Sequence, residues 1–214
     1  MEETQEKKYI YAHRGFWHKN LVQNSLESFI RASDKGFGVE TDVRLFQDTL
    51  IISHDNEKSK NNLKFQDLLN LDTAFALNIK EDGMGPYLHK IVDQLPKDSF
   101  FFDGSIPEMV KLRSIGLETA LRISEIEKDL PWKTNFIWLD SFFEDWWVGN
   151  REILGHLENG TKIIAVSPEL HGREKGFIWD SIVELRAKGF HNLGVCTDFP
   201  LEFFNHESSS SYGK

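Results

Sequence analysis

The chain has 214 residues, of which 40% are hydrophobic and 28% are charged, and its formal net charge is −9. This composition predicts one globular domain and excludes a disordered chain. It also argues against a protein that binds nucleic acid or an anionic membrane, because such proteins normally carry a basic patch. The single cysteine, Cys196, excludes an internal disulfide and a zinc site built from cysteines.

The sequence predicts a tail at each end of the chain, but no targeting segment and no membrane span. Residues 1–8 lack the basic segment and apolar stretch of a secretory signal, and no apolar run approaches the roughly 18 residues of a transmembrane helix. We therefore expect a cytoplasmic location. We expect residues 1–8 to be an N-terminal tail, residues 9–206 to form the folded domain, and the serine-rich residues 207–214 to be a disordered C-terminal tail.

Short segments rich in β-branched and aromatic residues recur along the chain, with helical or loop segments between them. We expect eight strands, together with an extra strand or strand extension at residues 50–53 that folds back through a turn at residues 47–49. The eight are residues 9–12, 39–46, 74–80, 100–103, 118–123, 136–139, 162–166 and 192–196.

Helix start and stop signals lie between these strands. Asn24 is expected to cap a helix that has Glu27 at its third position and ends at Gly36. Apolar residues at 88, 91, 92 and 95 have the spacing of one helical face. Further helices are expected from residue 107 to 116, around residues 153–157 and from residue 177 to 188, whereas residues 124–131 show no convincing helix.

Strands that alternate with helices predict a parallel sheet, and eight such units predict an α/β fold, a compact (β/α)8 TIM barrel in a single domain. A doubly wound open sheet is the alternative, but it normally shows a glycine-rich phosphate loop, which this sequence lacks. In a barrel the active site forms at the carboxyl ends of the strands. Residues that end the predicted strands are therefore the candidates for a functional site.

Imidazole, guanidinium and carboxylate groups gather where the first predicted strands end. His13 and Arg14 end the first strand, and Glu40 and Asp42 lie two apart on the second, hence on the same face. His54 follows the back-folded segment, and Lys80 ends the third strand. Two histidines suit general acid-base catalysis, an arginine suits phosphate, and paired carboxylates suit a hard divalent cation. Together these groups indicate a metal-assisted phosphodiester site.

Several motifs have the order and spacing of a known family. They are Ala12-His13-Arg14-Gly15, Gln23-Asn24-Ser25, Glu40-Thr41-Asp42-Val43, His54-Asp55 and Cys196-Thr197-Asp198-Phe199-Pro200. With these motifs the chain resembles the glycerophosphodiester phosphodiesterase family, within the barrel superfamily that includes phosphatidylinositol phospholipase C. The likeness extends from residue 9 to about residue 200 and is most specific in the first quarter.

The resemblance implies a phosphoric diester hydrolase that acts on a small glycerophosphodiester-like or phosphoglycosyl substrate. It implies that His13 and His54 are the general acid and base. Arg14 and Lys80 would then bind the substrate phosphate. Glu40 and Asp42 would be ligands of one divalent cation, Mg²⁺ or Ca²⁺. No nucleic-acid partner and no stable membrane association are expected.

The third strand departs from the family, which usually has Glu-x-Lys there, because this chain has Asn78 and Lys80. Three outcomes stay open: Asn78 binds the cation through its amide oxygen, Asp103 supplies the missing carboxylate, or the cation is lost together with the activity. The last outcome favours a barrel that binds a phosphorylated ligand without turnover. A membrane-acting phospholipase or lyase is a further alternative, for which Trp17 and the pair Trp146-Trp147 are the only hints.

Other polar residues near predicted strand ends have common structural explanations. Asp55 could orient the His54 ring or serve in a turn, and Asp103 and Asp140 could face a site or simply start loops. Trp146 and Trp147 could line the rim of a pocket or pack in the interior. Glu169 and His171 lie on the loop side that faces substrate but are expected to be ordinary loop residues.

Overall fold

The computed structural model describes residue 7 and residues 9–18, 20–56, 58–128 and 133–211. The chain divides into two compact units. One consists of residues 12–119, and the other of residues 1–11 with residues 120–214; we call them the 12–119 unit and the 120–214 unit. The expected N-terminal tail, residues 1–8, lies outside the described residues apart from Lys7.

The 12–119 unit contains a parallel sheet with one antiparallel addition. β2 (Gly38–Phe46) pairs in parallel with β4 (Phe75–Ile79), and β4 pairs in parallel with β5 (Phe100–Phe102). β3 (Thr49–Ile52) folds back antiparallel on β2 through a turn in which Gln47 and Asp48 both have positive φ. β3 is the extra strand that residues 50–53 predict.

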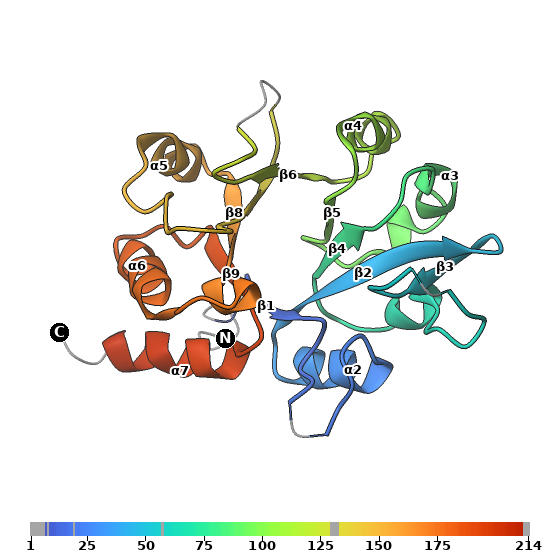
Figure 1. Ribbon diagram of the computed structural model, residues 1–214, viewed down its shortest axis with the longest axis horizontal. Coiled ribbons are helices and arrows are strands. Elements are labelled where there is room, and N and C mark those ends of the chain that lie inside the picture. Colours follow the sequence, from blue (N-terminus) through green and yellow to red (C-terminus); the bar gives the residue numbers. More distant parts are fainter. Residues whose placement is uncertain (1–6, 8, 19, 57, 129–132, 212–214) are drawn as a thin grey trace. The chain divides into compact units, whose positions relative to one another are not determined.

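Two helices of nine residues each, α2 (Leu26–Asp34) and α4 (Ile106–Ser114), belong to this unit, and α2 packs against β2 (Figure 1). α4 begins at Ser105, whose Oγ accepts a hydrogen bond from the backbone N–H of Glu108. The shorter elements are α3 (Gly85–Leu88) and the 3₁₀ turns η1 (Phe65–Leu68) and η2 (Val92–Gln94). The predicted helix over residues 107–116 is thereby confirmed within two residues at its end.

The sequence predicts Asn24 as the N-cap of α2, whereas the structure has Ser25 in that position. The Oγ of Ser25 accepts a hydrogen bond from the backbone N–H of Ser28 at 3.2 Å. Asn24 has a φ of 56°, and its Oδ1, the atom that would accept the cap hydrogen bond, accepts from the Thr41 hydroxyl instead. The capping prediction is wrong by one residue because the asparagine is used elsewhere.

The helix predicted over residues 88–95 is also wrong. α3 ends at Leu88, and only the short turn η2 follows. Pro96 disfavours the helical conformation for the residue before it, and Leu95 is accordingly extended with a ψ of 136°.

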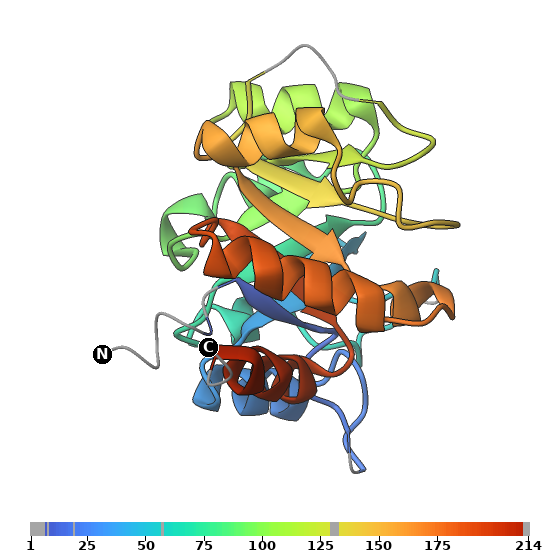
Figure 2. The same ribbon diagram turned by 90° about the vertical axis from the view of Figure 1, so that its left-hand side faces the viewer.

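The 120–214 unit repeats the alternation of strands and helices. Its strands β6 (Ala120–Ile123), β7 (Phe136–Leu139), β8 (Lys162–Val166) and β9 (Leu193–Thr197) are successive parallel neighbours. α5 (Arg151–Glu158) joins β7 to β8, and η3 (Pro168–His171) and α6 (Gly176–Ala187) join β8 to β9. α7 (Pro200–Ser211) follows β9 and lies beside α6, as both ribbon views show (Figures 1 and 2).

α7 includes residues 207–211, which the serine-rich sequence predicts to be disordered. The hydroxyls of Ser208, Ser209 and Ser210 donate to backbone carbonyls four residues earlier. Glu207 forms an ion pair with the buried Arg186 of α6 at 2.6 Å. These contacts hold the last turns in the helix, while residues 212–214 lie outside the described part of the chain.

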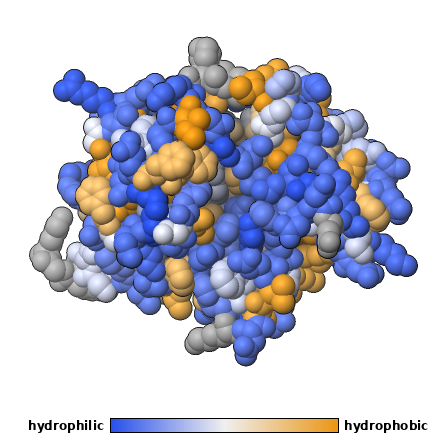
Figure 3. Space-filling model, viewed as in Figure 1, coloured by the Kyte–Doolittle hydropathy of each residue, from blue (hydrophilic) through white to orange (hydrophobic). Residues whose placement is uncertain are grey.

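The parallel strands and intervening helices confirm the predicted α/β fold class. In the described residues, β1 (Ile10–His13) and seven of the strands above match the eight predicted ones, in the element order of a (β/α)8 TIM barrel. Apolar side chains of the strands form the core of each unit, and hydrophilic residues cover most of the face over β2 and β3 in Figure 3. No helix in the described residues is long and apolar enough to cross a membrane.

Gly194 of β9 is required by a close backbone approach within the 120–214 unit. A Cβ at this position would lie 2.1 Å from the carbonyl oxygen of Tyr9. We expect Gly194→Ala to lower the free energy of unfolding by about 2 kcal/mol, measured by urea denaturation. Gly155→Ala is the matched control, because a Cβ there meets nothing within 4 Å and alanine favours the helix. Equal stability of the two variants would contradict this assignment.

Candidate active site

Neighbouring strands of the 12–119 unit position the predicted acidic and cationic residues. Glu40 and Asp42 lie two apart on β2, so that their side chains share one face, and they are only 2% and 1% exposed. The parallel register places Asp42 opposite Asn78 of β4, and Lys80 follows the last residue of β4. Both carboxylates of the pair are therefore buried on one face of β2.

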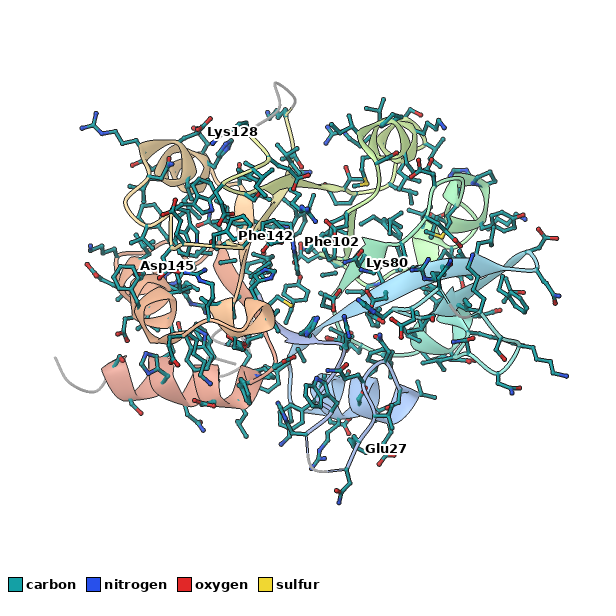
Figure 4. All side chains as sticks on the ribbon, in the orientation of Figure 1. Glu27, Lys80, Phe102, Lys128, Phe142 and Asp145 are labelled. Atoms are coloured by element: carbon teal, nitrogen blue, oxygen red, sulfur yellow. The ribbon has the colours of Figure 1, made fainter. Side chains whose placement is uncertain are left out.

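Asp42 is surrounded by donors. Lys80 Nζ lies 3.0 Å from Oδ1, Asn24 Nδ2 donates to Oδ2 at 2.8 Å, and Arg14 Nε lies 3.4 Å from Oδ2. Burial favours the neutral acid, but Lys80, the Asn24 hydrogen bond and Arg14 outweigh it and lower the pKa of Asp42 below its usual 3.8. Asp42 is therefore ionised at neutral pH and forms ion pairs with the side chains of Lys80 and Arg14. Figure 4 labels Lys80 near β2.

The turn after β1 positions Arg14. Its φ is 55°, its backbone N–H donates to Glu40 Oε2 at 3.2 Å, and its Nη1 donates to Gln23 Oε1 at 3.2 Å. The next residue, Gly15, has a φ of 88°, and a Cβ there would lie 2.4 Å from Ser28 Oγ. The glycine of the His-Arg-Gly motif therefore lets the turn pass close to α2 while Arg14 reaches the acid pair.

Glu40 lies next to His13, whose Nε2 is 3.9 Å from Glu40 Oε2. Burial, and then the charge of Asp42, raise the pKa of Glu40 from 4.5 to about 7, against the opposing effects of His13, Lys80 and Arg14. Glu40 is therefore partly protonated near neutral pH. The His13 side chain is 20% exposed and so retains access to solvent for proton exchange.

His54 lies after β3 and is the most exposed of the predicted site residues, with 45% of its side chain accessible. Its Nδ1 is 2.8 Å from Asp55 Oδ1, and its backbone carbonyl accepts a hydrogen bond from Arg44 Nη2 at 2.9 Å. A carboxylate beside Nδ1 favours the tautomer with the proton on that nitrogen, which leaves Nε2 as the proton acceptor. Of the two roles considered for Asp55, the contact agrees with orientation of the ring.

Asn78, the residue of β4 opposite Asp42, is 7% exposed. Its Nδ2 donates to Asp103 Oδ2 at 3.0 Å. Its Oδ1 is buried and has no hydrogen-bond partner among the described residues. The two residues considered as substitutes for the third carboxylate are therefore bonded to each other, and one amide oxygen is left unsatisfied.

The predicted divalent cation needs several oxygen ligands, at about 2.0–2.6 Å. In the part of the chain that the structure describes, no group of three or more His, Cys, Asp or Glu side chains is arranged to hold a metal ion. Asp42 already accepts from Lys80 and Asn24, and Asp103 accepts from Asn78. The free amide oxygen of Asn78 is a single neutral ligand. This donor set does not fit Mg²⁺ or Ca²⁺.

The structure thus brings together most of the predicted site residues in one group. We call this group the Asp42 cluster; it consists of His13, Arg14, Asn24, Glu40, Asp42 and Lys80. Asn78 adjoins it through the strand register, and Asp103 through Asn78. His54 lies in the same unit on the loop after β3.

Two residues are not predicted as site residues from the sequence: Asn24, which belongs to the Asp42 cluster, and Gln23, which accepts a hydrogen bond from Arg14 of that cluster. Asn24 links two residues of β2, since its Nδ2 donates to Asp42 and its Oδ1 accepts from the Thr41 hydroxyl. The signal was present in the Gln23-Asn24-Ser25 motif, where a serine follows the asparagine and is a sufficient cap by itself.

Other polar candidates lie in the 120–214 unit. His171 Nε2 is 2.7 Å from Asp140 Oδ1, beside a pocket of about 540 Å³. Glu169 accepts hydrogen bonds from the hydroxyls of Ser167 and Thr197, which makes it a structural link between β8 and β9. The pocket is lined by Arg122, Ile126, Glu127, Phe142, Phe143 and His171.

The two tryptophans also belong to this unit. Trp147 is 1% exposed, and Trp146 Nε1 donates to the backbone carbonyl of Asp140 at 2.9 Å. Trp147 is therefore a packing residue, and Trp146 fixes the loop after β7.

No protein-family model matches the chain, and no curated protein matches it. Among solved structures, the chain is similar to the crystal structure of a glycerophosphoryl diester phosphodiesterase from Parabacteroides distasonis. The sequence identity is 15% and the TM-score is 0.42, and the match covers 98% of this chain and 91% of that chain.

Proposed function

We propose that this protein cleaves small phosphodiesters at the Asp42 cluster. The observation that carries the proposal is the placement of Arg14 and Lys80 on one buried carboxylate, beside His13. A phosphodiester carries its negative charge on two non-bridging oxygens, which two adjacent cations suit. The substrate class that we propose is a glycerophosphodiester-like or phosphoglycosyl compound, in keeping with the resemblance of the sequence motifs.

In the proposed reaction a hydroxyl oxygen, from water or from a neighbouring alcohol of the substrate, attacks the phosphorus atom. One of His13 and His54 takes the proton of this hydroxyl, and the other gives a proton to the leaving alkoxide as its P–O bond breaks. The products are an alcohol and a phosphomonoester, or an alcohol and a cyclic phosphate when the substrate's own hydroxyl attacks. No step is assigned to the predicted divalent cation, because Glu40, Asp42 and Asn78 do not form a fitting ligand set.

Hydrolysis of glycerophosphocholine, glycerophosphoglycerol and bis-p-nitrophenyl phosphate, each with and without Mg²⁺ or Ca²⁺, tests this function. We expect at least one diester to be cleaved. The double variant His13→Ala, His54→Ala, purified in the same way, controls for contaminating phosphodiesterases and should be inactive. No turnover of any diester, or equal rates in the double variant, would contradict the proposal.

A phosphate-binding protein without turnover is the second candidate function. The neutral Asn78 in place of an acidic ligand favours it. Calorimetry with glycerol 3-phosphate separates the two candidates: binding by a protein that cleaves none of the diesters supports the binding protein, and cleavage excludes it.

A further inference from the structure

In the Asp42 cluster, two cationic side chains lie at the carboxylate that the sequence motifs predict as a metal ligand. Lys80 Nζ lies 3.0 Å from Asp42 Oδ1, and Arg14 Nε lies 3.4 Å from Oδ2. A divalent ion on the same carboxylate would lie at about 2.0–2.6 Å from one of these oxygens. It would then be within a few ångströms of two cations and would be repelled by both.

Lys80 is held in this position by its backbone as well as by its charge. Its N–H donates to the carbonyl of Val43 on β2 at 3.2 Å, and its own carbonyl accepts from Arg44 Nη1 at 3.4 Å. The strand register sets Asp42 opposite Asn78, two residues before Lys80. The ammonium group therefore reaches Asp42 from a fixed point at the end of β4.

The ammonium group is also placed to meet a ligand. Asp42 accepts one of its three N–H donors, and the Lys80 side chain is 20% exposed, whereas Asp42 is buried. Asp42 thus binds the ammonium group from one side, and the Lys80 side chain is still accessible from solvent.

We propose that Lys80, held on Asp42, takes the place of the divalent cation, so that the site works with a phosphodiester without a metal ion. This inference rests on the proposed function for its substrate, but the exclusion of the cation rests on the Asp42 cluster alone. Lys80 and Arg14 supply the positive charge that faces the non-bridging oxygens.

The first test compares chelator-treated wild type with protein given Mg²⁺, Ca²⁺ or Mn²⁺. We expect diester cleavage rates to agree within about twofold, and Lys80→Gln to lose about 100-fold in kcat/KM in every metal condition. Lys80→Met, which keeps the length of the side chain, guards against a folding defect, and Lys90→Gln on the exposed surface is the matched control. Loss of wild-type activity in chelator, restored by one of these ions, would overturn the inference.

The second test does not depend on turnover. Calorimetry of the wild type with Ca²⁺ and with Mg²⁺ should give no binding at millimolar ion. Lys80→Glu removes the competing charge and adds a third carboxylate to Glu40 and Asp42, so it should bind the ion measurably. Tight binding of either ion by the wild type, abolished in Asp42→Asn, would overturn the inference, as would a folded Lys80→Glu variant without affinity for the ions.

The two tests also separate the inference from the proposed function. A protein that cleaves no diester but shows the expected calorimetry contradicts the proposed function and supports the exclusion of the cation. A protein that cleaves diesters only with a bound ion supports the function and overturns the inference.

Discussion

His13→Ala is expected to lower kcat for diester cleavage by about 10²–10⁴-fold, the usual contribution of a general acid or base. The imidazole lies 3.9 Å from Glu40 and next to Arg14, so it is beside the positive charge that we expect to hold the phosphate. Removal of the ring removes proton transfer but leaves Arg14 and Lys80 in place on Asp42. KM should therefore change little while kcat falls, as initial-rate kinetics will show.

His54→Ala should have a loss in the same range, and the pH profile should lose a different limb in each of the two single variants. His89→Ala is the control, because His89 is an exposed residue that caps the end of α3 and does not belong to the Asp42 cluster. A His13→Ala variant with wild-type kcat would exclude the ring from proton transfer. A variant in which only KM rises would make His13 a binding residue.

The meeting of His13, Arg14, Glu40, Asp42 and Lys80 could be predicted because it follows from the strand pattern. Parallel neighbouring strands end at the same edge, and residues two apart on a strand share a face. Those two rules need only the strand boundaries, which apolar runs and turn residues indicate. Burial of Glu40 and Asp42 agrees with the expectation.

The partners of these residues could not be predicted in the same way. The contact of Lys80 with Asp42 depends on the β2–β4 register and on a side-chain rotamer, neither of which sequence spacing determines. The contact of Asn24 with Asp42 depends on a left-handed backbone conformation just before α2. The fit to a divalent cation therefore depends on atomic contacts that the sequence does not determine.

The helical residues 207–211 illustrate a different limit. A serine-rich terminal segment has low helix propensity and predicts disorder, yet Glu207 of α7 pairs with Arg186 of α6. Tertiary contact overrides local propensity there, and the partner residue lies about 20 positions earlier in the chain.

Glu40→Gln is expected to raise the stability of the protein at pH 8 while leaving it nearly unchanged at pH 4. Burial, and then Asp42, raise the pKa of Glu40 from 4.5 to about 7 in the folded protein. Between these two values the folded state binds more protons than the unfolded state, so the wild type loses stability as the pH rises. The difference between the two pKa values corresponds to a loss of roughly 3 kcal/mol in the free energy of unfolding. Glutamine avoids this loss because it carries no charge to bury.

The free energy of unfolding, measured by urea denaturation from pH 4 to pH 8 in the presence of a chelator, checks this prediction. Glu81→Gln is a control of opposite sign. Burial opposes ionisation of Glu81, but Lys58, the Leu45 N–H and Arg44 outweigh it and lower its pKa, so its carboxylate stabilises the folded state above pH 4.5. Glu81→Gln should therefore lose stability at pH 8, where Glu40→Gln gains it. A Glu40→Gln variant that is less stable than the wild type at pH 8 would mean that the buried carboxylate is ionised and compensated, which is the state that a bound cation would require.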